Sequence, residues 1–265
     1  MNSATVQKLL ALNRQFYQSF AEQFSETRQR LQPGVQRIAA RLSPTARLLD
    51  LGCGNGELAR SLHERGHTGL YIGVDFSPGL LSSGAKNLLP DNFSFIQADL
   101  ASPGWPGLVR STIDNLTGPA FDFILAFAVL HHLPGESLRQ QVLREAYDLL
   151  APGGQFIHSE WQFLNSPRLR RRVQPWETGG LTPAEVDPGD YLLDWRHGGS
   201  GLRYVHHFEA EELAALAKAA GFQCRETFYS DGEGSRLGLY QVWEKLGAQS
   251  GPGKTMQSLV SNKIV

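Results

Sequence analysis

The chain has 265 residues, of which 41% are hydrophobic and 19% charged, and its formal net charge is -1 at pH 7. This length and hydrophobic content suit the core of one α/β domain with additions. The near-zero charge excludes a global basic field, so any contact with nucleic acid must come from a local patch. The 2 cysteines, Cys53 and Cys224, favour neither a disulfide framework nor a four-ligand zinc site, and we expect no bound metal.

The N-terminal residues predict a helical preface to the main fold. Residues 1–14 are polar and mixed, without the long apolar run of a signal or membrane segment, so we expect a cytoplasmic enzyme with no membrane contact. Within residues 4–42, apolar side chains recur at helical spacing, and Pro33 begins a second helix. We expect this preface to pack over the mouth of a ligand site.

The most informative stretch is residues 48–57. It predicts a buried strand that ends near Asp50, then a glycine-rich turn, then a helix. The glycines of this turn are Gly52, Gly54 and Gly56. Because glycines leave the amides of a helix N-terminus bare, a polar or anionic ligand group can approach the backbone there. The dinucleotide fingerprint requires a further glycine where this chain has Glu57, so the spacing argues against NAD.

Two further predicted strands end in acids. Asp75 follows a short apolar run at about the 20-residue distance from the glycines at which an acid usually binds a ribose diol, and Phe76 beside it is placed to lie against an adenine. Asp99, followed by Leu100, ends a third strand, and the carboxyl ends of such strands bind ligands in open α/β sheets. The three acids Asp50, Asp75 and Asp99 have an alternative reading as helix caps.

A fourth strand is predicted over residues 121–127, ending at Phe127. The loop after it, residues 128–134, contains His131 and His132, which either take part in chemistry or only cover the sheet edge. A helix is predicted over 137–150, because the proline and glycines that follow from Pro152 stop it. A fifth strand is predicted to begin near residue 155. The segment 161–207 departs from the alternating pattern and is predicted to be a substrate-side insert or lid.

The acid followed by G-x-G-x-G, with acids ending the next strands, resembles the class I S-adenosylmethionine-dependent methyltransferases. The resemblance implies an α/β fold with a seven-stranded, mostly parallel Rossmann-like sheet, helices on both faces and an antiparallel last strand. The closing elements are expected at 210–220, 222–229 and 237–243, in a single domain over residues 1–245. A disordered tail is predicted over 246–265. The resemblance also implies S-adenosylmethionine as the cofactor. In the resembled family, the acid at the position of Asp99 binds the adenine amino group, and the loop at 128–134 lies beside the reactive methyl group. The positions expected to bind the cofactor are Asp50, Gly52, Gly54, Gly56, Asp75, Phe76, Asp99, Leu100 and Phe127.

Two regions resemble more narrowly the tRNA wobble-uridine methyltransferases that esterify a carboxymethyl group on uridine. They are residues 17–28, which carry the spacing Y-x-x-x-A-x-x-F-S-x-T-R, and the insert segments 189–195 and 203–208. Asp194 and Val205 depart from the family's proline and tyrosine, which leaves the substrate open. The resemblance implies tRNA as a partner, a small activating subunit as a second one, and a clamp for the acceptor carboxylate. The clamp residues are expected to be Tyr17, Arg28, Arg203 and His206.

The insert also carries groups suited to RNA. Four arginines offer phosphate contacts and four aromatic rings offer stacking surfaces for an unpaired base. The arginines are Arg168, Arg170, Arg171 and Arg172, and the rings are those of Trp161, Trp176, Trp195 and Tyr204. Equally, the arginines can form a solvated helix face and the rings can fix the insert to the sheet. Two other functions stay open: a methyltransferase for a small carboxylate, phenol or quinone, and a cofactor-binding protein without catalysis.

Overall fold

The computed structural model describes residues 1–26, 30–83, 89–113 and 120–246. Arg28 and nearly all of the predicted tail lie outside the described residues. Within them, no helix has both the length and the apolar character needed to cross a membrane.

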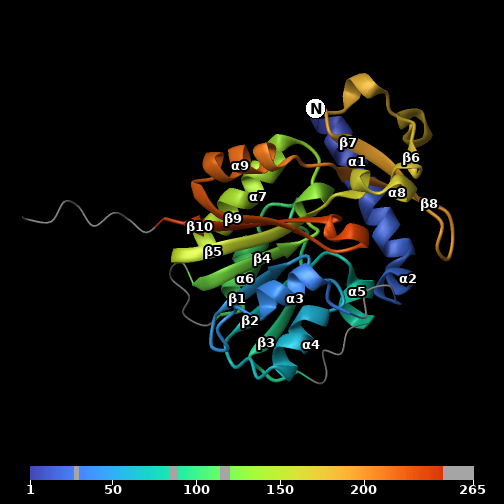
Figure 1. Cartoon of the computed structure of the whole chain (residues 1–265). Helices are drawn as coiled ribbons and strands as arrows, with labels where there is room; N and C mark the ends of the chain where they lie inside the picture. The colour runs from blue at the N-terminus through green and yellow to red at the C-terminus, as the bar shows by residue number, and fades with distance from the viewer. Residues whose placement is uncertain (27–29, 84–88, 114–119, 247–265) are drawn as a thin grey trace, which may run out of the picture.

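A seven-stranded sheet forms the centre of the fold, in the order β3-β2-β1-β4-β5-β10-β9 (Figure 1). The first five strands along the chain pair in parallel, and β10 pairs antiparallel with both β5 and β9. This confirms the predicted mostly parallel sheet with an antiparallel last strand. The strands are β1 (Leu48–Leu51), β2 (Tyr71–Asp75), β3 (Phe93–Gln97), β4 (Phe121–Phe127), β5 (Leu150–Trp161), β9 (Phe222–Ser230) and β10 (Gly238–Lys245). The start of β5 was predicted too late, because its pairing with β4 continues through an irregularity near Phe123.

Helices cover both faces of the sheet, as expected. One buried cluster joins apolar residues of α6, α7 and α9 to the strands, and a second joins those of α3 and α4 to the opposite face. The helices are α1 (Ser3–Ser19), α2 (Ala21–Glu26), α3 (Pro33–Ala39), α4 (Glu57–Glu64), α5 (Pro78–Ser83), α6 (Trp105–Ser111), α7 (Glu136–Leu149), α8 (Pro167–Arg170) and α9 (Ala210–Ala219). Short 3-10 helices occur at η2 (Leu130–His132), η3 (Phe163–Asn165), η4 (Trp176–Gly179), η5 (Pro183–Glu185) and η6 (Glu233–Ser235). The helical preface is thus confirmed in α1, α2 and α3.

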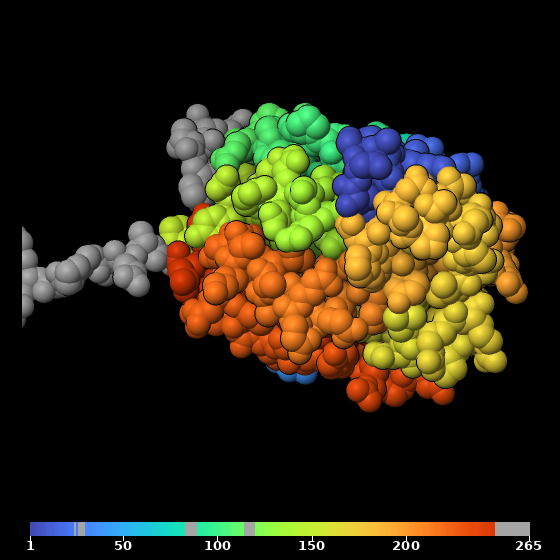
Figure 2. Space-filling view, turned by 90° about the horizontal axis from the view of Figure 1, so that it is seen from above, coloured from blue at the N-terminus to red at the C-terminus, as the bar shows by residue number. Residues whose placement is uncertain are grey.

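The insert forms a second, three-stranded antiparallel sheet, which the sequence pattern did not predict. Its strands are β6 (Val173–Gln174), β7 (Asp190–Trp195) and β8 (Gly201–His206). Figures 1 and 2 show this segment lying against α1, at the end of the molecule where α1 and α2 pack. The insert, α1 and α2 therefore form one layer beside the carboxyl ends of the parallel strands, whereas α3 covers a face of the sheet.

Asn13 joins α1 to both sheets. Its buried side chain accepts a hydrogen bond from the Tyr204 amide (2.8 Å) and donates to the Tyr204 carbonyl (3.2 Å) and the His132 carbonyl (3.3 Å). Tyr204 lies in β8 and His132 in the loop after β4. One amide side chain thus fixes the distance between the preface, the insert and the main sheet.

We predict that Asn13→Ala lowers the free energy of unfolding by about 1 to 3 kcal/mol, because it leaves buried backbone groups without their partners. Urea unfolding measures the loss. Gln7→Ala, at an exposed position of the same helix, is the matched control and is expected to change stability by less than about 0.5 kcal/mol. Equal stabilities for the two variants would contradict this role of Asn13.

Candidate functional site

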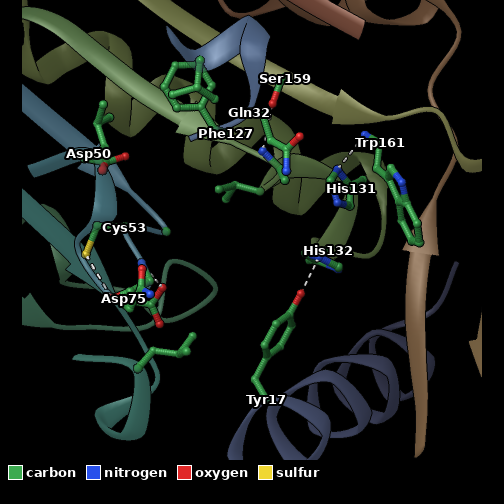
Figure 3. Close-up of a pocket in the computed structure, with 18 of the residues that line it drawn as sticks. Tyr17, Gln32, Asp50, Cys53, Asp75, Phe127, His131, His132, Ser159 and Trp161 are labelled. Carbon is green, nitrogen blue, oxygen red and sulfur yellow. Dashed lines mark hydrogen bonds between the residues drawn. The ribbon is translucent and has the colours of Figure 1, made fainter. Parts of the chain in front are cut away.

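A cavity of about 510 Å³ opens at the carboxyl ends of the parallel strands, beneath α1 and the insert. This volume is within the range of sites for small molecules and cofactors. Figure 3 shows side chains from opposite sides of it: Asp50, Cys53 and Asp75 on one side, and Tyr17, His131, His132 and Trp161 on the other. The first group comes from the β1 and β2 ends, the second from α1, the β4 loop and β5.

The glycine turn is shaped as the sequence predicts. Gly52, Gly54 and Gly56 have φ values of 71°, 55° and 74°, in the left-handed region that favours glycine. A Cβ on Gly52 would lie 2.6 Å from the Val129 side chain, whereas a Cβ on Gly54 would meet nothing within 4 Å. Gly52 and Gly54 line the cavity, whereas Gly56, the N-cap residue of α4, does not and faces the Phe95 ring. The open space at Gly54 lets a ligand approach the turn.

Asp75 both lines the cavity and supports this turn. Its carboxylate accepts hydrogen bonds from the amides of Gly54 (3.0 Å) and Ser77 (2.8 Å), and the residue is buried. Phe76, next in the chain, also lines the cavity, with its ring edge-on to Tyr17. The predicted pair of an acid and an aromatic ring therefore stands at the cavity wall.

Asp50 is the most deeply buried of the three predicted acids. It accepts a hydrogen bond of 2.5 Å from the Tyr71 hydroxyl. The pKa of Asp50 is raised to about 7, mainly by burial; the Tyr71 hydrogen bond lowers the pKa and the nearby Asp75 charge raises it, and the value includes both effects. Asp50 is thus a carboxyl group whose charge can change near neutral pH.

Asp99 occupies the wall next to α1. It pairs with Arg14 at 2.6 Å and accepts from the Ala101 amide at 2.9 Å. Leu100 and Phe127 line the cavity as well, so all the predicted cofactor positions except Gly56 do so. Sequence reasoning missed Arg14 and Asn13, although their spacing with Tyr17 places all three on one face of a predicted helix.

The other end of the cavity holds two of the four predicted clamp residues. The Tyr17 hydroxyl is hydrogen-bonded to His132 Nε2 at 2.7 Å. Buried Arg203 lies among aromatic rings, with its guanidinium 4.5 Å from the ring centroid of Trp161 and 5.7 Å from that of Trp195. Tyr17, His132, Trp161 and Arg203 all line the cavity. A buried cation beside aromatic faces at a cavity wall suits an anionic group of a ligand.

His206 does not line the cavity. It is buried, and its two ring nitrogens contact Asp190 (2.7 Å) and Glu212 (2.9 Å). Burial lowers the pKa of His206, but the hydrogen bonds to these two carboxylates outweigh burial and raise it. Arg139 contacts the same acids, at 3.8 Å and 3.3 Å. Because strand alternation turns His206 away from the cavity, its position fits a structural link between β8, α7 and α9 instead of a contact with a ligand.

The prediction that the insert's aromatic rings offer stacking surfaces for an unpaired base is wrong for two of the four rings. Tyr204 is completely buried and Trp195 is 8% exposed, so neither offers a stacking surface for an external base. Trp195 packs with Phe16 and Phe20 of the preface, and this favours the alternative in which such rings fix the insert. Trp161 remains at the cavity.

A buried cluster of one carboxyl group and two histidines escaped the sequence analysis. Glu160 lines the cavity together with His131 and is hydrogen-bonded to His131 Nδ1 (2.8 Å) and His158 Nδ1 (2.9 Å). The three residues are at most 1% exposed. Burial raises the pKa of Glu160 well above its usual value and lowers that of His158 to about 3. The spacing of His158 and Glu160 at i and i+2 in a strand was the available signal, because such residues share one face.

Within the part of the chain that the structure describes, no three His, Cys, Asp or Glu side chains are grouped so that they could hold a metal ion.

Comparison with known proteins gives one family match. A family model described as a methyltransferase domain matches residues 22–227. The chain is 28% identical over 236 residues to the tRNA (carboxymethyluridine(34)-5-O)-methyltransferase of Schizosaccharomyces pombe, covering 81% of this chain and 90% of that protein. It is 35% identical over 149 residues to a trans-aconitate 2-methyltransferase of Methylobacterium nodulans, covering 55% of this chain and 51% of that protein.

Solved structures with a similar fold include two methyltransferases. One is in a complex with the Haloferax volcanii Trm112 methyltransferase activator, with a TM-score of 0.61, 14% identity and coverage of 88% of this chain and 96% of that one. The other is the Burkholderia thailandensis 1,6-didemethyltoxoflavin-N1-methyltransferase with bound 1,6-didemethyltoxoflavin and S-adenosylhomocysteine, with a TM-score of 0.58, 20% identity and coverage of 92% and 88%. At these identities the likeness establishes the fold.

The pKa of Asp50 gives a prediction for stability. Because the folded-state pKa of about 7 exceeds the unfolded value of 3.8, the stability that protonated Asp50 confers is complete below pH 3.8 and is lost as the pH rises through about 7. Asp50→Asn stays neutral, so its stability relative to the wild type is expected to rise by about 3 kcal/mol between pH 5 and pH 8. Urea unfolding at both pH values measures this difference.

Asp91→Asn, at an exposed position, serves as the control. Its stability relative to the wild type is expected to be the same at pH 5 and pH 8. A difference between Asp50→Asn and wild type that is the same at pH 5 and pH 8 would show that Asp50 is ionised throughout this range.

Proposed function

We propose that this chain, which belongs to the methyltransferase domain family and is an S-adenosylmethionine-dependent enzyme, methylates the carboxymethyl group of a tRNA wobble uridine. The observation that carries the proposal is the buried Arg203 beside Trp161, on the side of the cavity opposite Asp50 and Asp75, where an acceptor carboxylate would meet it (Figure 3). Membership of a methyltransferase family also argues against the alternative of a cofactor-binding protein without catalysis.

The residues of the first cavity end fit S-adenosylmethionine. The open space at Gly54 and the exposed Gly52 give access to the backbone of the turn, and Asp75 presents a carboxylate at the right place for hydroxyl groups of a ribose. Asp50 adds a carboxyl group on the same side of the cavity as Asp75, and a negative charge there suits a positively charged cofactor. Asp99 stands at the wall next to α1, where it pairs with Arg14. The bound cofactor supplies a methyl group on a sulfonium, and the sulfur becomes a neutral thioether when the methyl passes to the acceptor oxygen.

A carboxylate acceptor needs no base, because it is ionised at neutral pH. The task of the protein is then to hold the acceptor oxygen in line with the methyl group and to neutralise the acceptor's charge. Arg203, Tyr17 and His132 are placed to form this clamp at the cavity wall. Arg28 belongs to the clamp by the sequence resemblance alone. The ester product carries no charge, so its attraction to Arg203 falls after transfer.

The arginines of the insert support an RNA acceptor. Arg168, Arg170 and Arg171 are exposed, and within the described chain no carboxylate forms an ion pair with them or with Arg172. Arginines without acidic neighbours are open to phosphate contacts. The relative from Schizosaccharomyces pombe, which aligns over most of both chains, acts by its name on carboxymethyluridine at position 34 of tRNA. A tRNA acceptor agrees with the cytoplasmic location expected from the sequence.

A small activating subunit is part of the proposal. The complex with the Haloferax volcanii activator contains a methyltransferase of the same fold, aligned over 88% of this chain. Activity assays should therefore be run with and without such a subunit.

A small carboxylate is the second candidate acceptor. The trans-aconitate 2-methyltransferase shares 35% identity over about half of each protein, and a clamp around Arg203 would serve its acceptor equally well. The two candidates differ in whether the insert's arginines matter.

Transfer of labelled methyl groups from S-adenosylmethionine to bulk tRNA, compared with a metabolite extract, tests the proposal. We expect label in tRNA, in an alkali-labile ester. Arg203→Ala is expected to lower kcat/KM for tRNA by about 10- to 100-fold, because it removes a charge-assisted contact with the acceptor, while leaving tRNA affinity nearly unchanged. Label only in the extract would instead support the small-carboxylate acceptor.

Replacing Arg168, Arg170, Arg171 and Arg172 together by Gln is predicted to weaken tRNA binding and to leave cofactor binding intact. Each lost phosphate contact should reduce the slope of log affinity against log salt by roughly 0.7 to 0.9. Filter binding at several salt concentrations measures the slope, and Arg144→Gln, at an exposed position of α7, is a control for charge alone. A slope equal to that of the wild type would contradict contact between the insert and RNA.

A further inference from the structure

The cluster of Glu160, His131 and His158 is not used by the mechanism above, although Glu160 and His131 line the cavity. Its hydrogen bonds determine where its protons lie. The Trp161 amide donates to His131 Nδ1 at 3.3 Å, so this nitrogen is an acceptor and carries no proton. Figure 3 shows this bond between Trp161 and His131.

The second contact of the same nitrogen then requires a proton from Glu160. Glu160 Oε2 lies 2.8 Å from His131 Nδ1, and two acceptors cannot form a hydrogen bond with each other. The Glu160 carboxyl group must therefore carry the proton, as a neutral acid. Its other oxygen, Oε1, accepts a hydrogen bond from His158 Nδ1 at 2.9 Å. This leaves His158 Nε2 as the bare nitrogen, which agrees with its lack of a hydrogen-bond partner in the described structure.

We propose that Glu160 is a positioning acid: it stays protonated, fixes His131 with its proton on Nε2, and so makes this wall a hydrogen-bond donor to the acceptor. The Nε2 edge is the side of the imidazole opposite the Nδ1 contacts with Glu160 and Trp161. A neutral donor here suits an acceptor oxygen that is already negative, as in a carboxylate. It does not suit a hydroxyl or phenol, which needs a base.

The charges around the cluster are consistent with this assignment. Burial raises the pKa of Glu160 well above its usual value, and Glu212 of α9 raises it further. Arg139 of α7 and the His131 amide act in the opposite direction but do not outweigh burial. His158 has a pKa of about 3 and stays neutral, so it is not a cation that would favour the ionised form of Glu160. An ionised Glu160 would also repel the acceptor carboxylate across a poorly solvated wall.

The inference rests on the proposed function for the identity of the acceptor, but its first test needs no acceptor. Nitrogen-15 NMR of the full-length chain with labelled histidine, with His131 assigned by its loss in His131→Gln, reports which ring nitrogen carries the proton. We expect Nε2–H at pH 7. A proton on Nδ1 would overturn the inference even if tRNA is methylated.

The second test uses substitutions of Glu160 in the methyl-transfer assay. Glu160→Leu removes the donor to His131 and is expected to lower kcat/KM by about tenfold or more. Glu160→Gln can donate to His131 Nδ1 and accept from His158, but its NH2 group loses the hydrogen bond that Oε2 accepts from the His131 amide at 3.1 Å, so it is expected to recover only part of that loss. It should also remove the alkaline fall in kcat/KM that ionisation of Glu160 causes in the wild type.

The outcomes separate the two proposals. If Glu160→Gln is as impaired as Glu160→Leu, the carboxyl group acts as a charged group and the inference is wrong. If the wild type methylates no RNA but the NMR experiment finds Nε2–H, the RNA acceptor fails and the donor wall stands. Glu136→Gln, at the exposed start of α7, controls for the loss of a carboxylate elsewhere.

Discussion

The order of the strands determines where this protein can bind a ligand. β1 lies between β2 and β4, so the chain leaves β1 toward one edge of the sheet and later returns to build the other half. At such a reversal the connecting segments diverge, and a crevice remains at the carboxyl ends of the strands. The glycine turn after β1 and the histidine loop after β4 form the two sides of this crevice. Each predicted acid reaches the cavity because its strand ends there.

Helix α1 forms a wall of the site and connects it to the insert. Asn13, Arg14 and Tyr17 lie on one face of it and contact three different parts of the protein: the insert, Asp99 and His132. Helical spacing makes these contacts simultaneous. A shift of α1 would therefore alter both ends of the cavity together, which couples the fold of the preface to the geometry of the site.

Charge is divided along the cavity. Asp50 and Asp75 lie on the side that would hold a cationic cofactor, and Arg203 lies beside Trp161 on the side that would hold an anionic acceptor. Glu160, next to Trp161 in the chain, also lines the cavity, and its burial favours the neutral form. An ionised carboxylate at that point would oppose the acceptor, so its protonation is what keeps the division of charge intact.

The sequence alone determined the first strands, the glycine turn and the acids that follow the strands, because these depend on local periodicity and on backbone conformations that glycine favours. The seven-stranded sheet and its antiparallel last strand followed from the family resemblance. The narrower resemblance also named Tyr17 and Arg203, and both line the cavity. The sequence could not show that His206 turns away from the cavity, that Tyr204 is buried, or that Glu160 joins two histidines. Those facts depend on which face of a strand meets which neighbour, and only the packing of α1 and the insert on the main sheet decided that.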